Sequence, residues 1–432
     1  MTVTLAIAGA GSRGKAYARY AERFPALARV VAVADPRPDY LGTLADRHPG
    51  ARRFDDWRAL ADAPRLADAV VVATPDRLHA EPVASLAQQG YAILLEKPMA
   101  VTEADCEAVV AAARRTGILL AVCHVLRYTP YTDMVKRLVN RGAVGDIVGI
   151  EHLEPVGWWH FAHAYVRGNW RRSDESFSSL LAKCCHDLDW LRYIVDSAPI
   201  RVASVGGLHH FHPGNRPAGA ADRCVDCAVE PGCPYSATRL YEACLADPAR
   251  HEWPLSVVTA DLTEAGVRTA LRDGPYGRCV YASDNDVADH QVVTVSFERG
   301  VTATLTMSAF TPSGHRRTRI MGTRGHLEGD GERAVVTDFV TGGVSTVSTA
   351  STASTASTVD ARVPAGADAG SGHGGGDFGL MAAFVEAVAT GDRTLVRSGP
   401  EESLDSHRMA FAAERSRVAG GVPVPLPRDL AG

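Results

Sequence analysis

One stretch near the start of the chain, residues 5–14, limits the possible folds more than any other. Apolar residues lead directly into Gly9, Gly11 and Gly14, which are spaced as G-x-G-x-x-G, and residues 15–24 continue with the apolar spacing of a helix. A strand, a glycine turn and a helix in this order are the context of the dinucleotide fingerprint. The first glycine permits a tight turn, the second lets the backbone approach a pyrophosphate, and the third allows close helix–strand packing. The stretch therefore predicts a Rossmann-type unit whose helix N-terminus binds the phosphates of a dinucleotide.

The next apolar strand, residues 30–34, indicates which dinucleotide is bound. It ends at Asp35, about 20 residues past Gly14, where the fingerprint places a ribose-binding carboxylate. Such a carboxylate accepts hydrogen bonds from both ribose hydroxyls and repels a 2′-phosphate, so NAD is favoured. Arg37 could hold that phosphate instead, which leaves NADP as the alternative. Ser12 and Arg13, within the glycine loop, are also expected to contact the cofactor.

Length and composition agree with a globular enzyme. The 432 residues leave room for two or three domains, and 46% hydrophobic and 22% charged residues are ordinary for such proteins. The net charge of −5 argues against a nucleic-acid partner. Without an apolar run of about 18 residues, no membrane span is expected, and the early first strand leaves no room for a signal peptide. Nine cysteines in such a chain suggest thiols or metal ligands in a reducing compartment, so we expect a cytoplasmic protein.

Up to about residue 125, short apolar strands alternate with helical stretches. The expected strands are 69–73, 92–95 and 118–122, and the expected helices are 79–89 and 102–115. This alternation predicts a doubly wound parallel sheet, whose ligands bind beyond the carboxyl ends of the strands. Thr74, Glu96, Lys97 and His124 all lie at such ends. We therefore expect residues 1–125 to form the dinucleotide-binding domain and to carry chemistry at this edge.

From residue 126 to 432 the pattern changes to that of an α+β domain with a mostly antiparallel, open sheet. The expected helices are 131–140, 179–195, 377–390 and 401–418, and the expected strands are 147–153, 291–297, 302–308 and 317–321. We expect this domain to bind substrate and to form a homodimer or homotetramer through its sheet. A cysteine-rich insertion covers about 209–280, and a low-complexity loop without chemistry covers about 343–376.

Four motifs occur in an order that resembles the glucose–fructose oxidoreductase / inositol dehydrogenase / MocA family. They are the glycine loop 9–14, Ala73-Thr74-Pro75 with His79, Glu96-Lys97-Pro98, and His186-Asp187-Leu188-Asp189. The resemblance implies that a nicotinamide lies between the two domains and that a secondary alcohol of a sugar or cyclitol is reversibly oxidised. It also implies that Thr74, Pro75, His79, Glu96 and Lys97 lie against the cofactor and that Pro98 follows a cis bond.

Lys97 and His186 are the leading catalytic candidates. Burial and a neighbouring nicotinamide cation disfavour the ammonium form of a lysine at this strand end. Lys97 can then share a proton with the reacting hydroxyl and stabilise developing alkoxide charge, while Glu96 orients it. His186 interrupts an apolar helix stripe and can take the substrate proton near neutral pH.

One position departs from the pattern of the family. An aspartate is expected one helical turn before His186, but Ala182 stands there and Lys183 follows. Either Asp187, Asp189 or Lys183 takes its place, or the reaction differs. The different reaction would be that of an NAD-dependent glycosidase or lyase, which oxidises the sugar transiently and recycles the cofactor. The segment from His373 to Asp377 resembles the glycine-rich histidine segment of the family's NAD-dependent glycosidases. A third hypothesis, an NAD-binding sensor without activity, is disfavoured by the intact Lys97 and His186.

Aromatic and cationic residues between the two motifs suggest a sugar-binding surface. Aromatic faces stack on sugar C–H groups, and arginine or histidine binds hydroxyls, carboxylates or phosphates. An aromatic core with a solvated arginine face is the alternative. The expected substrate contacts are Tyr128, Trp159, His163, Arg167, Trp170, Asp189 and His373.

The insertion contains Cys224 and Cys227 in a C-x₂-C spacing, followed by Cys233 after a Pro-Gly turn. This spacing suits structural zinc, which requires four ligands. Cys279 is favoured as the fourth ligand, with Cys244 or a histidine as alternatives. Free thiols remain the competing interpretation.

Overall fold

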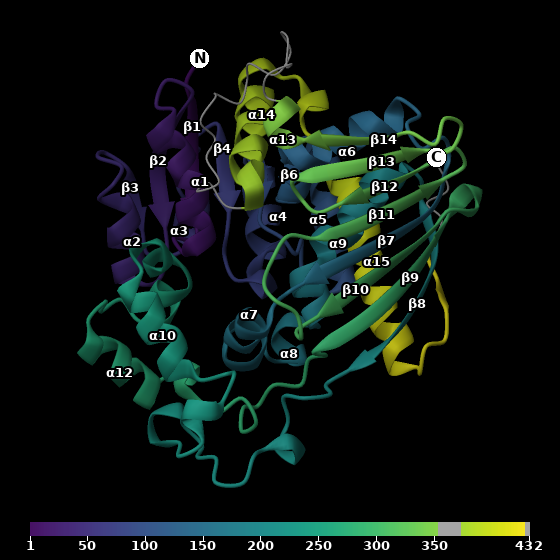
Figure 1. The fold of residues 1–432 in the computed structure, drawn as a ribbon. Coiled ribbons are helices and arrows are strands. Elements are labelled where there is room, and N and C mark those ends of the chain that lie inside the picture. Colours follow the sequence, from purple (N-terminus) through teal and green to yellow (C-terminus); the bar gives the residue numbers. More distant parts are fainter. Residues whose placement is uncertain (353–372, 428–432) are drawn as a thin grey trace.

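The N-terminal part of the computed structural model is a six-stranded, entirely parallel sheet with strand order β3-β2-β1-β4-β5-β6 (Figure 1). The structure describes residues 1–352 and 373–427. The strands are β1 (Val3–Ala8), β2 (Ala28–Ala34), β3 (Arg52–Phe54), β4 (Ala69–Val72), β5 (Ala92–Leu95) and β6 (Leu120–Val122). The helices between them are α1 (Ser12–Arg23), α2 (Pro38–Ala45), α3 (Trp57–Asp62), α4 (Ala80–Gln88) and α5 (Glu103–Thr116). The predicted doubly wound sheet is confirmed.

Local sequence explains several of these elements. All four residues of β4 are buried, as expected for a parallel strand covered on both faces. Thr102 caps α5 by accepting a hydrogen bond from the Asp105 N–H, and Gly117 ends the helix in the left-handed conformation (φ 66°). These signals lie within a few residues of the element that they define, so the sequence alone could reveal them.

The second sheet has nine strands in the order β14-β13-β12-β11-β7-β10-β9-β8-β15. Its strands are β7 (Ile147–Pro155), β8 (Pro199–Gly207), β9 (His290–Phe297), β10 (Thr302–Ser308), β11 (Arg317–Gly322), β12 (Gly325–Gly329), β13 (Arg333–Asp338), β14 (Val344–Ser348) and β15 (Val424–Pro425). All pairs are antiparallel except β7 with β10. The open, mostly antiparallel sheet is therefore confirmed.

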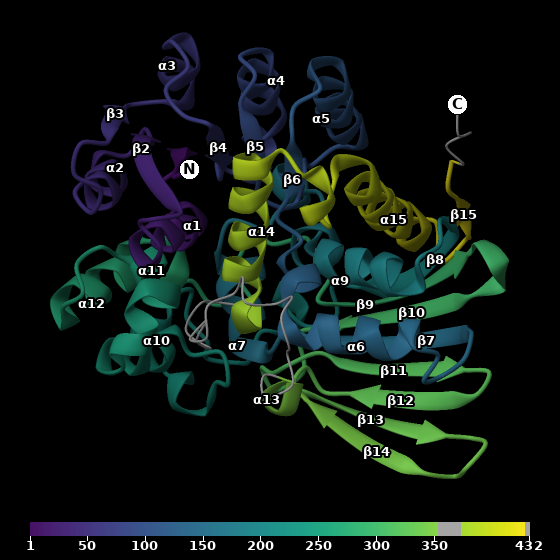
Figure 2. The ribbon, with the colours of Figure 1, turned by 90° about the horizontal axis from the view of Figure 1, so that it is seen from above.

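Helices cover one face of this sheet, among them α9, which carries the predicted histidine (Figure 2). The helices of this half are α6 (Pro130–Asn140), α7 (Trp158–Phe161), α8 (Ser173–Ser176), α9 (Ser179–Val195), α13 (Thr349–Thr352), α14 (Gly376–Thr390) and α15 (Pro400–Val418). A groove on the sheet is lined by side chains such as Val292, Thr304 and Val335. No helix in the described ranges is both long and apolar enough to span a membrane.

The structure differs from the expected domain division in one respect. Helix α14 packs its buried residues Leu380, Met381 and Phe384 into the hydrophobic core that contains Ile7 and Val33 of the parallel sheet. Figure 2 shows α14 beside α1. The C-terminal part of the chain therefore returns to complete the dinucleotide-binding half. The predicted loop at 343–376 is also partly wrong, because β14 forms within it; its residues 353–372 lie outside the described residues.

The cysteine-rich insertion forms a separate unit next to the parallel sheet. It contains α10 (Ala237–Ala246), α11 (Ser256–Val258) and α12 (Glu264–Asp273), which pack around a small hydrophobic cluster of their own. Figures 1 and 2 show these helices near α1 and α2. An ion pair between Arg19 and Glu252, with a 2.5 Å N–O distance, joins the insertion to α1.

Candidate active site

The glycine loop has the shape that a dinucleotide requires. Gly9 has φ +104°, and a Cβ atom on it would lie 2.2 Å from the Ala73 carbonyl oxygen. A Cβ atom on Gly14 would lie 1.9 Å from the Gly9 carbonyl oxygen. At Gly11, in contrast, a Cβ atom would meet only the Arg37 side chain, at 3.7 Å, so a ligand can approach the backbone. Helix α1 begins directly afterwards without a side-chain cap, which leaves its first N–H groups available to a pyrophosphate.

Asp35 lies at the end of β2 as expected, but Arg37 covers it. The carboxylate accepts hydrogen bonds from the Ala10 N–H at 2.8 Å and from Arg37 Nε and Nη2 at 2.9 Å each. Burial alone would raise the pKa of Asp35, but the hydrogen bonds from Arg37 and Ala10 outweigh it and lower the pKa. The Arg37 guanidinium also lies over the Tyr40 ring, 3.8 Å from its centroid. A ribose can reach Asp35 only if this guanidinium moves aside or shares the carboxylate.

Arg13 links three parts of the site. Its Nε lies 2.5 Å from Glu96 Oε1, and its Nη2 lies 2.8 Å from Asp377 Oδ1 at the start of α14. Tyr17 donates a further hydrogen bond to Glu96 at 2.8 Å. Burial would raise the pKa of Glu96 and of Asp377, but the charge of Arg13 outweighs it, and both values are lowered. Arg13, predicted to contact the cofactor, thus neutralises two buried carboxylates.

Lys97 follows β5 and reaches the helix that carries His186. Its Nζ donates a hydrogen bond to the Ala182 carbonyl oxygen at 2.7 Å, and its N–H donates one to Glu96 Oε2 at 2.5 Å. The Lys97–Pro98 bond is cis, as the resemblance implied. Lys97 Nζ therefore binds the backbone of the residue at which an aspartate was expected, one helical turn before His186.

His186 is buried, with 4% of its surface exposed, and its Nδ1 has no hydrogen-bond partner among the described residues. Its ring centroid is 5.8 Å from that of His124 and 5.7 Å from that of His373. Burial, and after it the charge of Lys97, lowers the pKa of His186 well below its usual value. This environment favours the neutral imidazole, and among the described residues no partner occupies its Nδ1.

None of the three residues proposed to replace the missing aspartate does so among the described contacts. Asp187 binds His152 at 3.0 Å and Arg316 at 2.5 Å. Asp189 forms two hydrogen bonds with Arg127, at 2.7 and 2.8 Å, and is fully buried. The Lys183 Nζ lies 3.4 Å from Glu154 Oε1. Buried charges must be paired, and these residues are paired away from His186.

Several predicted substrate contacts lie in the protein interior instead. The Tyr128 hydroxyl bonds Ser398 at 2.9 Å, and His163 Nδ1 lies 2.8 Å from the Tyr241 hydroxyl. Arg167 is 1% exposed and lines the pocket of the cysteine-rich insertion. Together with Asp189, these residues have buried protein partners, and their predicted substrate contacts stay predictions.

Trp159, Trp170 and His373 are more accessible. Trp170 Nε1 donates a hydrogen bond to Asp76 Oδ2 at 2.7 Å, which ties the second domain to the loop after β4. Trp159 stacks on His160, with ring centroids 5.6 Å apart. His373 Nδ1 lies 3.3 Å from Asp377 Oδ1. These residues keep their predicted substrate role as a proposal.

His79 connects two loops at the edge of the parallel sheet. Its two ring nitrogens lie 2.8 Å from the Pro98 carbonyl oxygen and 2.9 Å from that of Thr74, and the side chain is fully buried. It therefore joins the Thr74-Pro75 loop to the loop that carries Lys97, and the cofactor contact of His79 stays a prediction. Thr74 and Pro75 themselves lie at the carboxyl end of β4, as expected.

Sequence reasoning missed Asp76 and His160. Burial raises the pKa of Asp76. Burial, and then the charge of Lys183, lowers the pKa of His160 well below its usual value, and Lys97 and His373 contribute to the same shift. His160 therefore lies near the catalytic candidates. Asp76 directly follows Thr74-Pro75, so its place after a strand end was an available signal; His160 lay within the aromatic segment but had no distinguishing signal.

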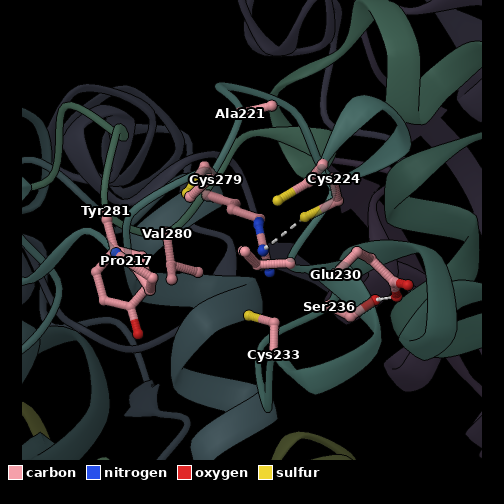
Figure 3. Close-up of a pocket in the computed structure, with 13 residues that line it drawn as sticks. Pro217, Ala221, Cys224, Glu230, Cys233, Ser236, Cys279, Val280 and Tyr281 are labelled. Atoms are coloured by element: carbon pink, nitrogen blue, oxygen red, sulfur yellow. Dashed lines mark hydrogen bonds between the residues drawn. The ribbon is translucent and has the colours of Figure 1, made fainter.

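The four predicted zinc ligands lie around a pocket of the insertion, apart from the catalytic candidates. Cys224, Cys227, Cys233 and Cys279 line one pocket in the insertion, together with Arg167 (Figure 3). Cys244 is not among the lining residues. As the side chains stand, no group of three or more cysteine, histidine or acidic residues in the described ranges is close enough to hold a metal ion.

Comparison with known proteins agrees with both halves of the fold. Residues 3–124 match the model of an oxidoreductase family's NAD-binding Rossmann fold, and residues 136–426 match the model of that family's C-terminal alpha/beta domain.

Two curated relatives are similar over parts of their length. A 2,7-anhydro-N-acetylneuraminate hydratase of Escherichia coli is 30% identical over 151 residues, which cover 35% of this chain and 40% of the relative. Inositol 2-dehydrogenase 1 of Saccharopolyspora erythraea is 32% identical over 238 residues, which cover 52% of this chain and 62% of the relative. The matched stretches thus span about half the length of these relatives.

Among solved structures, a levoglucosan dehydrogenase in complex with NADH and L-sorbose superposes with a TM-score of 0.70 over 99% of this chain and 100% of that chain. Its sequence identity is 19%, so the similarity concerns the fold.

Proposed function

The chain belongs to the GFO/IDH/MocA oxidoreductase family, and from this membership we propose that it interconverts a secondary alcohol and a ketone on a sugar, sugar derivative or cyclitol with NAD. The observation that carries the proposal is the position of Lys97, whose Nζ lies beside the helix turn that leads to His186, a buried histidine whose Nδ1 has no partner among the described residues. The names of the relatives, an inositol dehydrogenase and a levoglucosan dehydrogenase, support the substrate class.

In the proposed reaction, His186, Lys97 and Glu96 have different roles. The glycine loop 9–14 and Asp35 would hold NAD, which would supply the hydride acceptor for the carbinol carbon. His186, through a nitrogen without a protein partner, takes the hydroxyl proton as the C–O bond becomes a carbonyl. Lys97 stabilises the negative charge that develops on that oxygen. Glu96, fixed by Arg13 and Tyr17, holds the backbone of Lys97 in place.

Steady-state turnover with a Lys97→Met variant tests this proposal. The protein is assayed with NAD against inositols, hexoses, anhydrosugars and sugar acids, and NADH formation is followed. Loss of proton sharing and charge stabilisation should lower kcat at least ~10³-fold, while NAD still binds. Lys136 provides a matched control, since its Nζ donates to the Tyr193 carbonyl oxygen at 2.6 Å far from the site. Lys136→Met should keep activity, and a Lys97→Met enzyme with more than half the wild-type turnover would exclude the proposed role.

A second candidate, an NAD-dependent glycosidase or lyase, is favoured by one specific feature. His373 lies 5.7 Å from His186, ring centroid to ring centroid, where it could serve as a second acid or base. The hydratase among the relatives points the same way. This reaction would consume substrate without net NADH, whereas a dehydrogenase forms one NADH per ketone. Measured NADH stoichiometry therefore separates the two candidates.

We also propose that the protein forms a homodimer or homotetramer and that it is cytoplasmic. The groove on the open sheet, with Val292 38% and Val335 37% exposed, supports a homodimer or homotetramer formed through this face. All nine cysteines are unpaired, which supports a reducing compartment such as the cytoplasm. Light scattering should give a mass of two or four chains, and a charged substitution such as Val292→Glu should lower it; a monomeric wild-type protein would contradict the assembly.

A further inference from the structure

Four cysteines that the proposed reaction does not use surround one pocket (Figure 3). Cys224 and Cys227 lie at the two ends of a 3-10 turn, since the Cys227 N–H donates to the Cys224 carbonyl oxygen at 3.3 Å. Cys233 follows a second such turn, Glu230–Gly232. Cys279 comes from the far end of the insertion, beyond α12.

The backbone brings these two ends of the insertion together. Arg223 and Arg278 form an antiparallel bridge, and the Cys279 N–H donates to the Asp222 carbonyl oxygen at 2.8 Å. Cys279 is therefore held next to Cys224 although more than fifty residues separate them in the chain. This arrangement makes Cys279, rather than Cys244, the fourth thiol of the group.

The sulfur of Cys224 accepts two N–H hydrogen bonds. The Ala237 N–H donates to it at 3.5 Å, and Arg167 Nη2 donates to it at 3.6 Å. A neutral thiol is a weak acceptor, whereas a thiolate accepts charge-assisted hydrogen bonds well. These two donors therefore suit a sulfur that carries negative charge when a metal ion is bound, as a coordinating cysteine does.

Arg167 carries a buried charge without a carboxylate partner in the described part of the chain. It is 1% exposed, and its other hydrogen bonds go to the carbonyl oxygens of Arg278 and Tyr235, each at 2.7 Å. Its Nη1 has no partner at all among the described residues. A buried charge without a compensating partner is unfavourable. An anionic group bound in this pocket would therefore compensate the charge of Arg167.

We propose that Cys224, Cys227, Cys233 and Cys279 bind one structural zinc ion as thiolates. Four S–H protons leave to solvent, four S–Zn bonds form, and the resulting charge of −2 is partly neutralised by Arg167. As placed, no three of these thiols are close enough to share an ion, so binding requires the sulfur atoms to move inward. Zinc–sulfur bonds of about 2.3 Å define the final positions.

The ion would stabilise a unit that its own core supports weakly. The insertion has only a small separate hydrophobic cluster, and units of this size commonly depend on a metal or disulfides. Zinc would fix the two ends of the insertion, while the Arg19–Glu252 ion pair attaches its other side to α1.

Metal analysis of the purified full-length chain tests this site. We expect about one zinc per chain by mass spectrometry, since a structural site is nearly filled. Cys227→Ala and Cys279→Ala should lower the zinc content below ~0.2 per chain and expose residues 209–280 to limited proteolysis. Cys244→Ala is the matched control, because Cys244 is buried in the same insertion but does not line the pocket; it should retain zinc.

Three results would overturn the proposal: a wild-type chain that stays below ~0.2 zinc after incubation with zinc salt, a Cys227→Ala variant that keeps its metal, or a disulfide among these cysteines in the reduced cytosolic preparation. If the variants do not fold, cobalt can replace zinc in the intact wild-type chain. Tetrahedral thiolate coordination then gives intense d–d bands and sulfur-to-cobalt charge transfer, and the absence of both would exclude the site.

Discussion

At the nucleotide end of the site, the Arg37 guanidinium and a bound ribose would compete for the Asp35 carboxylate. Asp35 provides the ribose contact that favours NAD, yet both of its oxygens already bind Arg37. Arg37 is 53% exposed at its side chain, so it can move toward solvent or toward a phosphate. Cofactor choice therefore depends on which partner Arg37 takes when the nucleotide binds.

An Asp35→Ser substitution should shift the preference from NAD toward NADP. It removes the charge that repels a 2′-phosphate and releases Arg37 to bind it, so the ratio of the two dissociation constants should change by at least ~10-fold, or about 1.4 kcal/mol. Titration of nucleotide binding by calorimetry measures both constants. The double substitution Asp35→Ser with Arg37→Ala serves as control and should lose the gain for NADP. If the ratio of the NAD and NADP dissociation constants is unchanged in Asp35→Ser, Asp35 does not distinguish the two cofactors.

Residue type alone did not show which polar side chains face the substrate. Tyr128, His163, Arg167 and Asp189 all suit sugar binding, but their partners lie 270, 78, 57 and 62 residues away in the chain. Such pairing depends on the folded arrangement and leaves no local pattern. The positions of the glycine loop, Lys97 and His186 in the fold could be predicted, because their motifs place them at strand ends or on a helix face; their roles stay predictions.

Strands and helices whose own residues carry the apolar periodicity or capping pattern were predicted well from the sequence. Helix α9 has the expected bounds, Ser179–Val195, and β10 has the expected bounds, Thr302–Ser308. Strand β14 was missed because three of its five residues are exposed and show no apolar alternation; pairing with β13 forms it. The return of α14 to the parallel sheet was also unpredictable, since the contact joins the two ends of the chain.

The bridge between Arg13 and Asp377 should hold α14 in place. Asp377→Asn removes a buried charge that binds Arg13, and the free energy of unfolding should fall by about 1–3 kcal/mol. Asp46→Asn is the control, because its ion pair with Arg53 is more than half exposed on both side chains and should contribute less than ~1 kcal/mol. Urea unfolding measures both. Equal effects of the two substitutions would contradict a structural role for the bridge.

For the whole molecule, buried histidines make stability depend on pH. Burial, followed by the charge of Arg167 for His163 and of His124 for His407, lowers the pKa of both residues to about 3. An unfolded histidine titrates near 6.5, so between pH 6.5 and 3 the unfolded chain binds protons that the folded chain does not. The free energy of unfolding should therefore fall as the pH falls through this window, by up to about 1.4 kcal/mol per pH unit for each histidine.

Unfolding experiments from pH 7 to pH 4 measure this slope. A His163→Gln variant can keep a hydrogen bond to Tyr241 but no longer titrates, so its slope should be smaller by about one proton. A slope identical to that of the wild type would show that His163 takes up its proton in the folded state.

Deuterium transfer from the carbinol carbon to NAD tests the proposed chemistry most directly. A polyol that supports turnover is labelled at the carbon to be oxidised, and the reduced nucleotide and the product are analysed by mass spectrometry. Hydride transfer assisted by Lys97 and His186 predicts one deuterium in each NADH and one ketone per NADH. Consumption of the substrate with the deuterium returned to the product and no NADH released would contradict net oxidation and establish cofactor recycling instead.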